Sequence, residues 1–180
     1  MNGMTKSVQW MVAAALAFAA SAALAQSGAQ VSALKGHDSD APVDVTADRI
    51  EVQDRADRAV FAGNVKARQG SLTLDTARLT LAYSSGPGIQ IHRLDASGGV
   101  VVTSPSEVAR GNFAVYDLDR KLITLVGDVR LARDGSTIYG SRLLIDLNSG
   151  RAVIDGGAPG VGQSGGRVTG HFAVPKREQQ

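Results

Sequence analysis

The sequence predicts an all-β domain, built from repeated hairpins whose sheet curves along its length. Apolar and polar residues alternate at residues 50–52 and 79–81, which is the period of a strand with one buried face. A unit of two strands joined by a turn with an acidic and a basic residue recurs at residues 47–65, 114–129 and 141–156. Because a lone hairpin cannot bury its own apolar face, the repetition predicts that the units stack.

Glycine recurs near the end of each unit. The first two copies close on Gly-x-Val, at Gly63 and Gly127, whereas the third reaches Gly156 without the valine. Glycine inside a strand pattern is typical of a bulge, a bend or a close backbone approach. Together with Gly99, these glycines predict that the sheet curves.

The first 25 residues have the pattern of a secretory signal peptide. Lys6 precedes an apolar stretch at residues 8–24, and a small-x-small site ends at Ala25. The alanine-rich stretch is short and weakly apolar for a membrane span. We therefore expect residues 1–25 to be a signal peptide cleaved after Ala25, with retention as an anchor as the alternative.

The mature chain is expected to form one domain between two tails. Residues 26–42 show no period and are interpreted as a flexible N-terminal arm, and residues 43–174 as the ordered domain. Within it, strands follow at short intervals with no room for the helices of a βαβ fold. A last strand at 167–174 follows a glycine-rich loop, and residues 175–180 are a polar tail. The strands are separated by turn signals at residues 84–88, 104–106, 133–136 and 156–160.

Composition and motifs do not favour an enzyme. The chain has 180 residues, no cysteine, 4% aromatic residues and a formal net charge of +2. Thiol chemistry is excluded, and the small charge does not indicate a nucleic-acid partner. The histidines, His37, His92 and His171, are isolated in the sequence, and no nucleophile elbow or phosphate loop is present. Aspartates at strand ends are expected to bind turn amides, so we predict no catalytic residue, metal or cofactor.

Most of the domain resembles the LptA/OstA-like family of periplasmic lipopolysaccharide-transport bridge proteins. The string F-x-G-N-V-x-x-x-Q-G-x-L, from Phe61 to Leu72, is its most specific part, and residues 45–52 and 77–83 match the flanking strands. The similarity covers residues 43–155.

The resemblance implies an open, curved antiparallel β-jelly roll in the periplasm. Its groove would shield the acyl chains of lipid A, the membrane anchor of lipopolysaccharide. Its edge strands, at residues 43–52 and 168–174, would pair with LptC-like and LptD-like domains and, head to tail, with further copies of this chain. The residues expected to line the groove are Ile50, Val52, Phe61, Val65, Leu72, Leu74, Leu79, Leu81, Phe113, Val115, Ile123, Leu125, Val129, Leu131, Ile138, Leu143 and Ile145.

Basic residues are candidates for the phosphates of lipid A at the groove mouth, because charge-assisted hydrogen bonds to phosphate are strong. Alternation also permits a simpler interpretation, in which they lie on the solvated face. The candidates are Lys66, Arg68, Arg110, Lys121, Arg130 and Arg133.

Three other functions stay open. The chain could be an LptC-like component anchored in the inner membrane, or an adaptor that pairs strands and holds no lipid. A polysaccharide-binding or polysaccharide-cleaving β-solenoid would need an aromatic platform, and the single tryptophan is Trp10, in the signal peptide. Alternation alone does not decide whether the interior is a filled core or an open slot.

Overall fold

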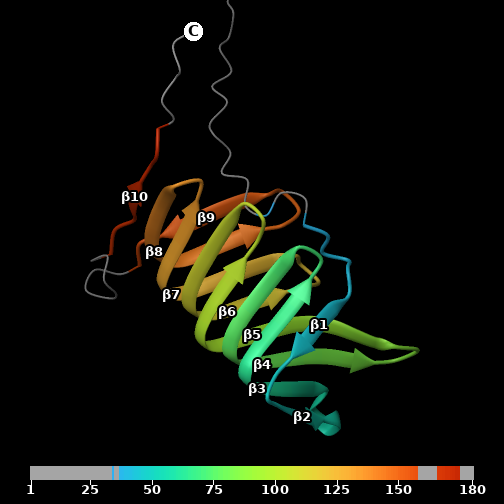
Figure 1. The fold of residues 1–180 in the computed structure, drawn as a ribbon. Helices are drawn as coiled ribbons and strands as arrows, with labels where there is room; N and C mark the ends of the chain where they lie inside the picture. Colours follow the sequence, from blue (N-terminus) through green and yellow to red (C-terminus); the bar gives the residue numbers. More distant parts are fainter. Residues whose placement is uncertain (1–33, 35–36, 158–165, 175–180) are drawn as a thin grey trace, which may run out of the picture.

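The computed structural model describes residue 34 and residues 37–157 and 166–174. These residues form one antiparallel sheet of ten strands, in the order β1-β3-β4-β5-β6-β7-β8-β10, with β2 beside β3 and β9 beside β8 (Figure 1). The prediction of an open all-β fold is confirmed. The strands are β1 (Val43–Thr46), β2 (Arg49–Gln53), β3 (Arg58–Gln69), β4 (Leu72–Ser85), β5 (Ile89–Thr103), β6 (Glu107–Asp117), β7 (Leu122–Arg133), β8 (Ser136–Asp146), β9 (Arg151–Asp155) and β10 (Thr169–His171), with a 3₁₀ turn, η1 (Asp54–Ala56), after β2.

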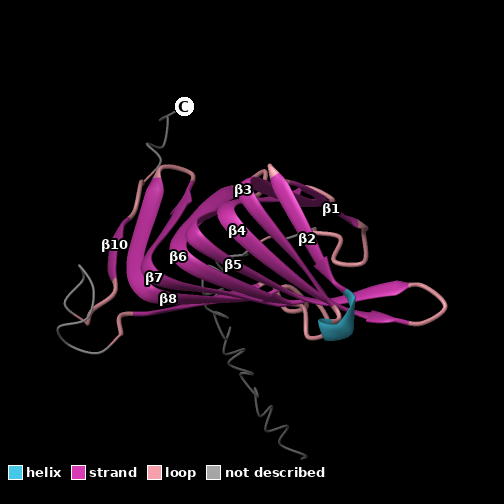
Figure 2. Cartoon of the chain, turned by 90° about the horizontal axis from the view of Figure 1, so that it is seen from below, coloured by secondary structure: helices cyan, strands magenta, loops and turns pink. Residues whose placement is uncertain are grey.

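The sheet is folded back on itself, because its long strands bend in the middle (Figure 2). The first layer contains β2, β9 and the strand segments 58–62, 78–85, 89–97, 113–117, 122–126 and 142–146. The second layer contains β1, β10 and the segments 65–69, 72–76, 100–103, 107–111, 129–133 and 136–140. The two layers form a V, with the hairpin turns at its mouth.

The recurring glycines lie at the bend, as the sequence predicts. Gly63, Gly98 and Gly127 have φ values of +80°, +86° and +82°, a conformation that residues with a Cβ rarely adopt. The registers with the following strands shift at these positions, so the glycines form bulges. Each is followed by a second residue of positive φ and then by a valine that is 1% exposed, namely Val65, Val100 and Val129.

β9 and β10 are the two halves of a last bent strand. Asp155 lies opposite Arg142 of β8, and Thr169 lies opposite Tyr139. Continuing this register places Val168 opposite Gly140, the position that Val129 takes on the other side of β8. The valine missing from the third copy is therefore Val168, displaced by an insertion at residues 158–167.

The core lies between the inner faces of the two layers. Its most enclosed side chains are Leu79, Leu125 and Leu143, which are 0% exposed, and the valines of the bend pack with them. The expected signal peptide, the expected C-terminal tail and most of the expected N-terminal arm lie outside the described residues. No helix within the described part of the chain is long and apolar enough to cross a membrane.

Candidate functional site

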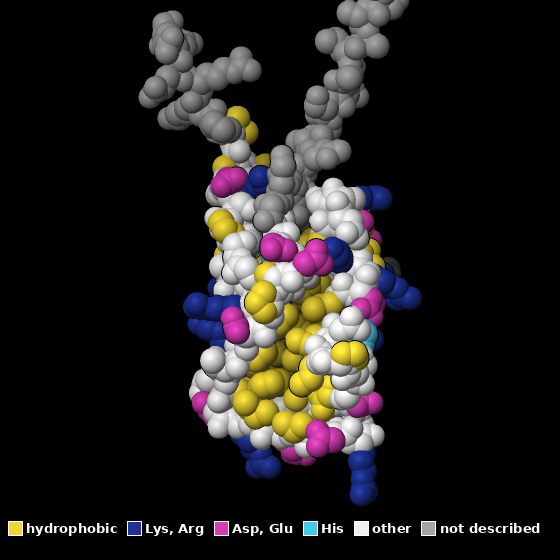
Figure 3. All heavy atoms as spheres, turned by 90° about the vertical axis from the view of Figure 1, so that its right-hand side faces the viewer, with side chains coloured by type: hydrophobic (Ala, Val, Ile, Leu, Met, Phe, Trp, Pro, Cys, Tyr) yellow, Lys and Arg dark blue, Asp and Glu magenta, His cyan; other side chains and the backbone are white. Residues whose placement is uncertain are grey.

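An apolar groove runs between the two layers, along the stack from β2 to the split strand β9–β10. Figure 3 shows its apolar floor between two walls of mainly polar side chains. Most of the residues predicted to line the groove lie on the inner faces and are buried. They are Phe61, Val65, Leu72, Leu74, Leu79, Leu81, Ile123, Leu125, Val129, Leu131, Leu143 and Ile145.

Three predicted groove residues lie on the inner face near the ends of the stack. Ile50 and Val52 are opposite Phe61 and Ala59 of β3, and residues paired across strands share a face. Because β2 is an edge strand, these two side chains stay 53% and 60% exposed. Ile138, paired with the buried Leu131, is half-buried near the other end.

Two predicted groove residues, Phe113 and Val115, point outward instead. Val115 is opposite Thr124, whereas Ala114 is buried opposite the fully buried Leu125. Phe113 is opposite Val126, and both are exposed, at 57% and 44%. The alternation changes phase at the register shift at residues 111–112, so around the bend Gly111 and Ala114 face the interior and Phe113 faces solvent.

The part of the groove near β3 and β4 is a narrow apolar slit. About 390 Å³ of unfilled space, open solvent at its mouth included, lies between the layers. Gln69 and Tyr116 stand among its otherwise mostly apolar lining. The lining residues are Val43, Ala67, Arg68, Gln69, Leu72, Leu74, Leu94, Val102, Ala114, Tyr116 and Ile123.

A wider apolar pocket opens at the C-terminal end. It holds about 690 Å³ of unfilled space, solvent at its mouth again included. β9 forms one wall and β10 with the residues beside it the other. The lining residues are Leu131, Ile138, Ala152, Ile154, Val168, Gly170 and Phe172.

The described part of the expected N-terminal arm, Leu34 and residues 37–42, contacts the sheet near the slit. Leu34 is 6% exposed and belongs to the core cluster, and its backbone N–H donates to Glu107. Burial raises the pKa of Glu107 above its ordinary value, and the same carboxyl carries an oxygen without a hydrogen-bond partner among the described residues. Residues 26–42 show no hydrophobic period, so their sequence does not reveal the burial of Leu34.

Gln69 and Tyr116 form a buried polar pair below that segment. Tyr116 Oη donates to Gln69 Oε1 at 2.9 Å. Tyr116 is 4% exposed and Gln69 is 5% exposed. Desolvation by burial and the nearby charge of Asp40 raise the pKa of Tyr116 to about 12. The phenol therefore stays neutral and keeps donating at any physiological pH.

The six basic candidates divide into two groups. Lys66, Arg68, Arg110 and Arg130 are exposed on the outer face of the second layer, which agrees with the simpler interpretation of a solvated face. Lys121 and Arg133 instead lie at the rim of the groove. Lys121 Nζ pairs with Asp40 at 3.1 Å, and Arg133 pairs with Asp134. The positive charge of Arg133 partly offsets the rise that burial causes in the pKa of Glu107.

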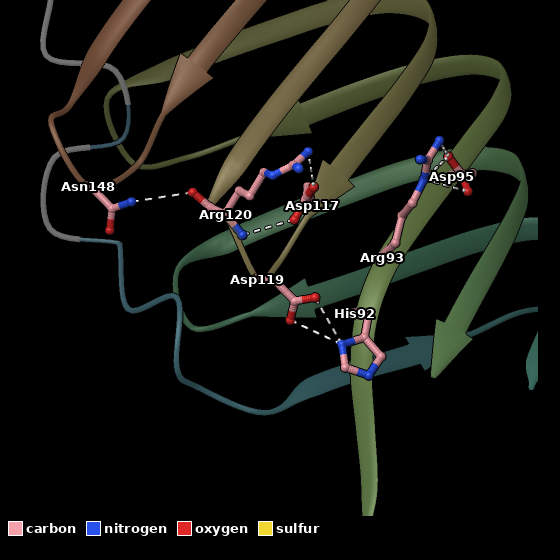
Figure 4. A network of polar contacts seen from close by, with 7 residues as sticks. All are labelled: His92, Arg93, Asp95, Asp117, Asp119, Arg120 and Asn148. Carbon is pink, nitrogen blue, oxygen red and sulfur yellow. Dashed lines mark hydrogen bonds and ion pairs between the residues drawn. The ribbon is translucent and has the colours of Figure 1, made fainter. Parts of the chain in front are cut away.

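Two aspartates on the first-layer rim, Asp117 and Asp146, accept backbone amides of turns, as the sequence predicts. Asp117 accepts the backbone N–H of Arg120 at 2.9 Å, and Asn148 Nδ2 donates to the carbonyl of Arg120 (Figure 4). His92 Nδ1 lies 3.0 Å from a carboxylate oxygen of Asp119, so the long β4–β5 hairpin is tied to the turn after β6. In the described residues no cluster of His, Asp or Glu has the geometry of a metal site.

These features define an open β-jelly roll with an apolar groove between its layers. A family model described as "LptA/(LptD N-terminal domain) LPS transport protein" matches residues 44–151. The chain therefore belongs to the LptA/LptD N-terminal-domain family of lipopolysaccharide-transport proteins, as the resemblance predicts.

Individual relatives agree with this assignment. The chain is 32% identical over 145 residues to an uncharacterized protein of Rhizobium meliloti, covering 76% of this chain and 77% of that protein. It is 25% identical over 126 residues to the lipopolysaccharide export system protein LptH of Pseudomonas aeruginosa, covering 64% of this chain and 72% of LptH. The crystal structure of LptH, titled as the LptA-homologous periplasmic component of the lipopolysaccharide transport device, has the same fold, with a TM-score of 0.66 at 20% identity over 77% of this chain and 99% of LptH.

Proposed function

We propose that this protein carries lipopolysaccharide across the periplasm by shielding the acyl chains of lipid A in its groove. The observation that carries the proposal is a continuous apolar inner face that remains accessible at the ends of the stack. Ile50 and Val52 expose this face at one end, and Val168 and Phe172 expose it at the other. Burying an acyl chain there gains about 0.8 kcal/mol for each CH₂ removed from water.

The proposed bridge forms through the two edges of the sheet. Among the described residues, no strand pairs with the outer edge of β1 and β2 or with that of β9 and β10. An unpaired strand is a template for a strand of another chain, so LptC-like and LptD-like domains and further copies of this chain are the proposed partners. Contacts between unlike edges join copies head to tail.

Export to the periplasm depends on the N-terminal sequence. Cleavage after Ala25 releases the domain, and retention of residues 1–25 yields the LptC-like anchored component instead. The mass of the exported chain separates these two cases.

Photo-crosslinking in cells tests lipid capture. A photoreactive residue at Ile50, Val52 or Ile138 is expected to form adducts with lipopolysaccharide, because these side chains line the accessible parts of the groove. Phe113 and Val126 are matched controls, since they are apolar and comparably exposed but lie on the outer face. Adducts at the inner positions alone support the groove, and equal labelling at inner and outer positions contradicts it.

The strand-pairing adaptor is the second candidate, because the centre of the interior is filled by Leu79, Leu125 and Leu143. An adaptor predicts crosslinks to neighbouring proteins from the edge strands and no lipid adducts from the groove. The same experiment, with positions in β1 and β10 added, distinguishes the two functions.

A further inference from the structure

Residues 37–42, here called the strap, cross the mouth of the groove. On the second layer the strap contacts Gln69, at the end of β3. On the first layer it contacts Lys121, in the turn between β6 and β7. A segment outside the sheet thus connects the tips of both layers above the slit.

The strap satisfies most of the hydrogen-bonding capacity of the Gln69 amide. Gln69 Nε2 donates to the carbonyl oxygens of Ser39 at 2.9 Å and of Ala41 at 3.0 Å. Gln69 Oε1 lies 3.1 Å from His37 Nε2 and also accepts the Tyr116 hydroxyl. If the strap leaves, two buried N–H donors face the mouth without acceptors, which is costly unless other oxygen atoms replace those of the strap.

Lys121 is the second donor that the strap occupies. Its Nζ lies 3.1 and 3.2 Å from the two carboxylate oxygens of Asp40. Lys121 is largely covered, whereas the Asp40 side chain is 82% exposed, so the acid approaches the lysine from the solvent side. An incoming anion can take the same approach.

The space below these donors is apolar. Gln69 and Tyr116 belong both to the polar rim and to the lining of the slit, and two positions nearer the bend on their strands the lining residues are the buried Ala67 and Ala114. Oxygen-binding donors above an apolar slit match an amphipathic molecule whose chain enters the slit and whose anionic head remains at the rim.

We infer that Gln69, Tyr116 and Lys121 form a binding site for the phosphate-bearing headgroup of the carried lipid, and that the strap occupies this site when no lipid is bound. The inference rests on the proposed function and adds to it where the headgroup sits and how the site is covered. The Asp40 carboxylate and the carbonyl oxygens of Ser39 and Ala41 take the places of headgroup oxygens.

The strap is suited to being displaced. His37 Nδ1, in the strap itself, and Glu107 Oε2, next to Leu34, are buried without hydrogen-bond partners among the described residues. Unsatisfied buried polar atoms weaken the packed state relative to one in which water reaches them. The strap also contributes few apolar contacts, since its residues alternate between half-buried and exposed.

A disulfide lock tests the inference. An ideal Cβ on Gly70 would lie 3.9 Å from the Cβ of Ala41, within the range of disulfide-bonded pairs, and the chain has no cysteine of its own. We expect the Ala41→Cys/Gly70→Cys protein to bind bisphosphorylated lipid A at least about tenfold more weakly when oxidised than when reduced. The oxidised and reduced forms carry the same two substitutions. Strain from a cysteine at the positive φ of Gly70 is therefore present in both forms and does not account for a difference in their lipid affinity.

The outcomes separate this inference from the proposed function. Equal lipid affinity in the oxidised and reduced states contradicts the inference that the strap covers the lipid site, and it does not contradict lipid carriage itself. No lipid binding by the reduced form or the wild type overturns the proposed function itself.

Charge variants test the headgroup site independently. Asp40→Asn is expected to tighten lipid binding by about two- to fivefold, the worth of a partly exposed ion pair. Lys121→Gln is expected to lower the preference for bisphosphorylated over dephosphorylated lipid A by about tenfold. Asp44→Asn and Arg110→Gln are matched controls, since both side chains are exposed and form no ion pair with another described residue. An unchanged preference in Lys121→Gln overturns the headgroup site.

Discussion

The strap-covered slit and the C-terminal pocket are two parts of one groove that differ in how they are closed. The slit holds about 390 Å³ of unfilled space and the C-terminal pocket about 690 Å³, each with solvent at its mouth included. Over the slit, residues 37–42 connect the two layers, and the bent strands below it are continuous. At the pocket the last bent strand is interrupted between β9 and β10. The same hairpin unit thus gives a covered interior where residues 37–42 cross it and an open interior where the last strand is interrupted.

The largest expected effect concerns the filled centre of the interior, between the two layers. Leu125→Ala should lower the free energy of unfolding by about 2–5 kcal/mol, because a fully buried side chain is replaced by a cavity. Val126→Ala is the matched control on the outer face, with an expected change within about 0.5 kcal/mol. Urea unfolding measures both, and similar costs would contradict a filled centre.

The buried rim of the slit should give stability a dependence on alkaline pH. The pKa of Tyr116 is about 12 in the folded protein against 10.0 for free tyrosine, so folding favours the neutral phenol. This contribution is fully present below pH 10 and is lost as the pH rises through 12, and it amounts to about 2–3 kcal/mol. Urea unfolding between pH 9 and 11.5 should show the decline in the wild type and in Tyr139→Phe but a weaker one in Tyr116→Phe. An equal decline in all three proteins would exclude Tyr116 as its source.

The bend shared by both parts of the groove should tolerate no side chain at its glycines. A Cβ on Gly127 would lie 2.8 Å from Asn112 Nδ2, at a φ of +82°. Gly127→Ala should therefore lower the free energy of unfolding by about 1–2 kcal/mol. Gly88, in the β4–β5 turn, has open space around it, so Gly88→Ala is the control and should change little. The same urea titration decides whether the two glycines differ.

The smallest expected effect on stability is at the open pocket, where the effect on lipid should be large. Phe172 is 63% exposed, so Phe172→Ser should change the free energy of unfolding by no more than about 0.5 kcal/mol. Lipid crosslinking from Ile138 should nevertheless fall, because Phe172 lines the same pocket. Unchanged crosslinking from Ile138 would show that Phe172 does not help to hold lipid in this pocket.

The sequence predicts the repeated units well because each depends on local patterns. Alternation identifies the strands, and the positive φ of Gly63 and Gly127 explains why glycine precedes each buried valine. The alternation fails at β6 for a physical reason. The bulges of the neighbouring strands shift the register at residues 111–112, where β6 crosses the bend and its alternation changes phase, so Ala114 points inward and Phe113 outward.

Long-range features were not accessible from local patterns. The packing of the strap depends on contacts such as Lys121 with Asp40, which are 81 positions apart in the chain. The valine of the last unit was missed because the insertion at residues 158–167 separates Val168 from Gly157. Reading the register of β8 on both sides recovers it, and that requires the paired structure.

The stacking of bent strands also bears on how the molecule can change in length. Each strand makes its main backbone contacts with its immediate neighbours in the sheet, so no long-range pairing fixes how many strands there are. Neighbouring strands are about 4.8 Å apart, and duplicating one hairpin would extend the trough by about 10 Å without altering its cross-section. Gene duplication within this architecture is therefore a route to conduits of different span that accept the same cargo.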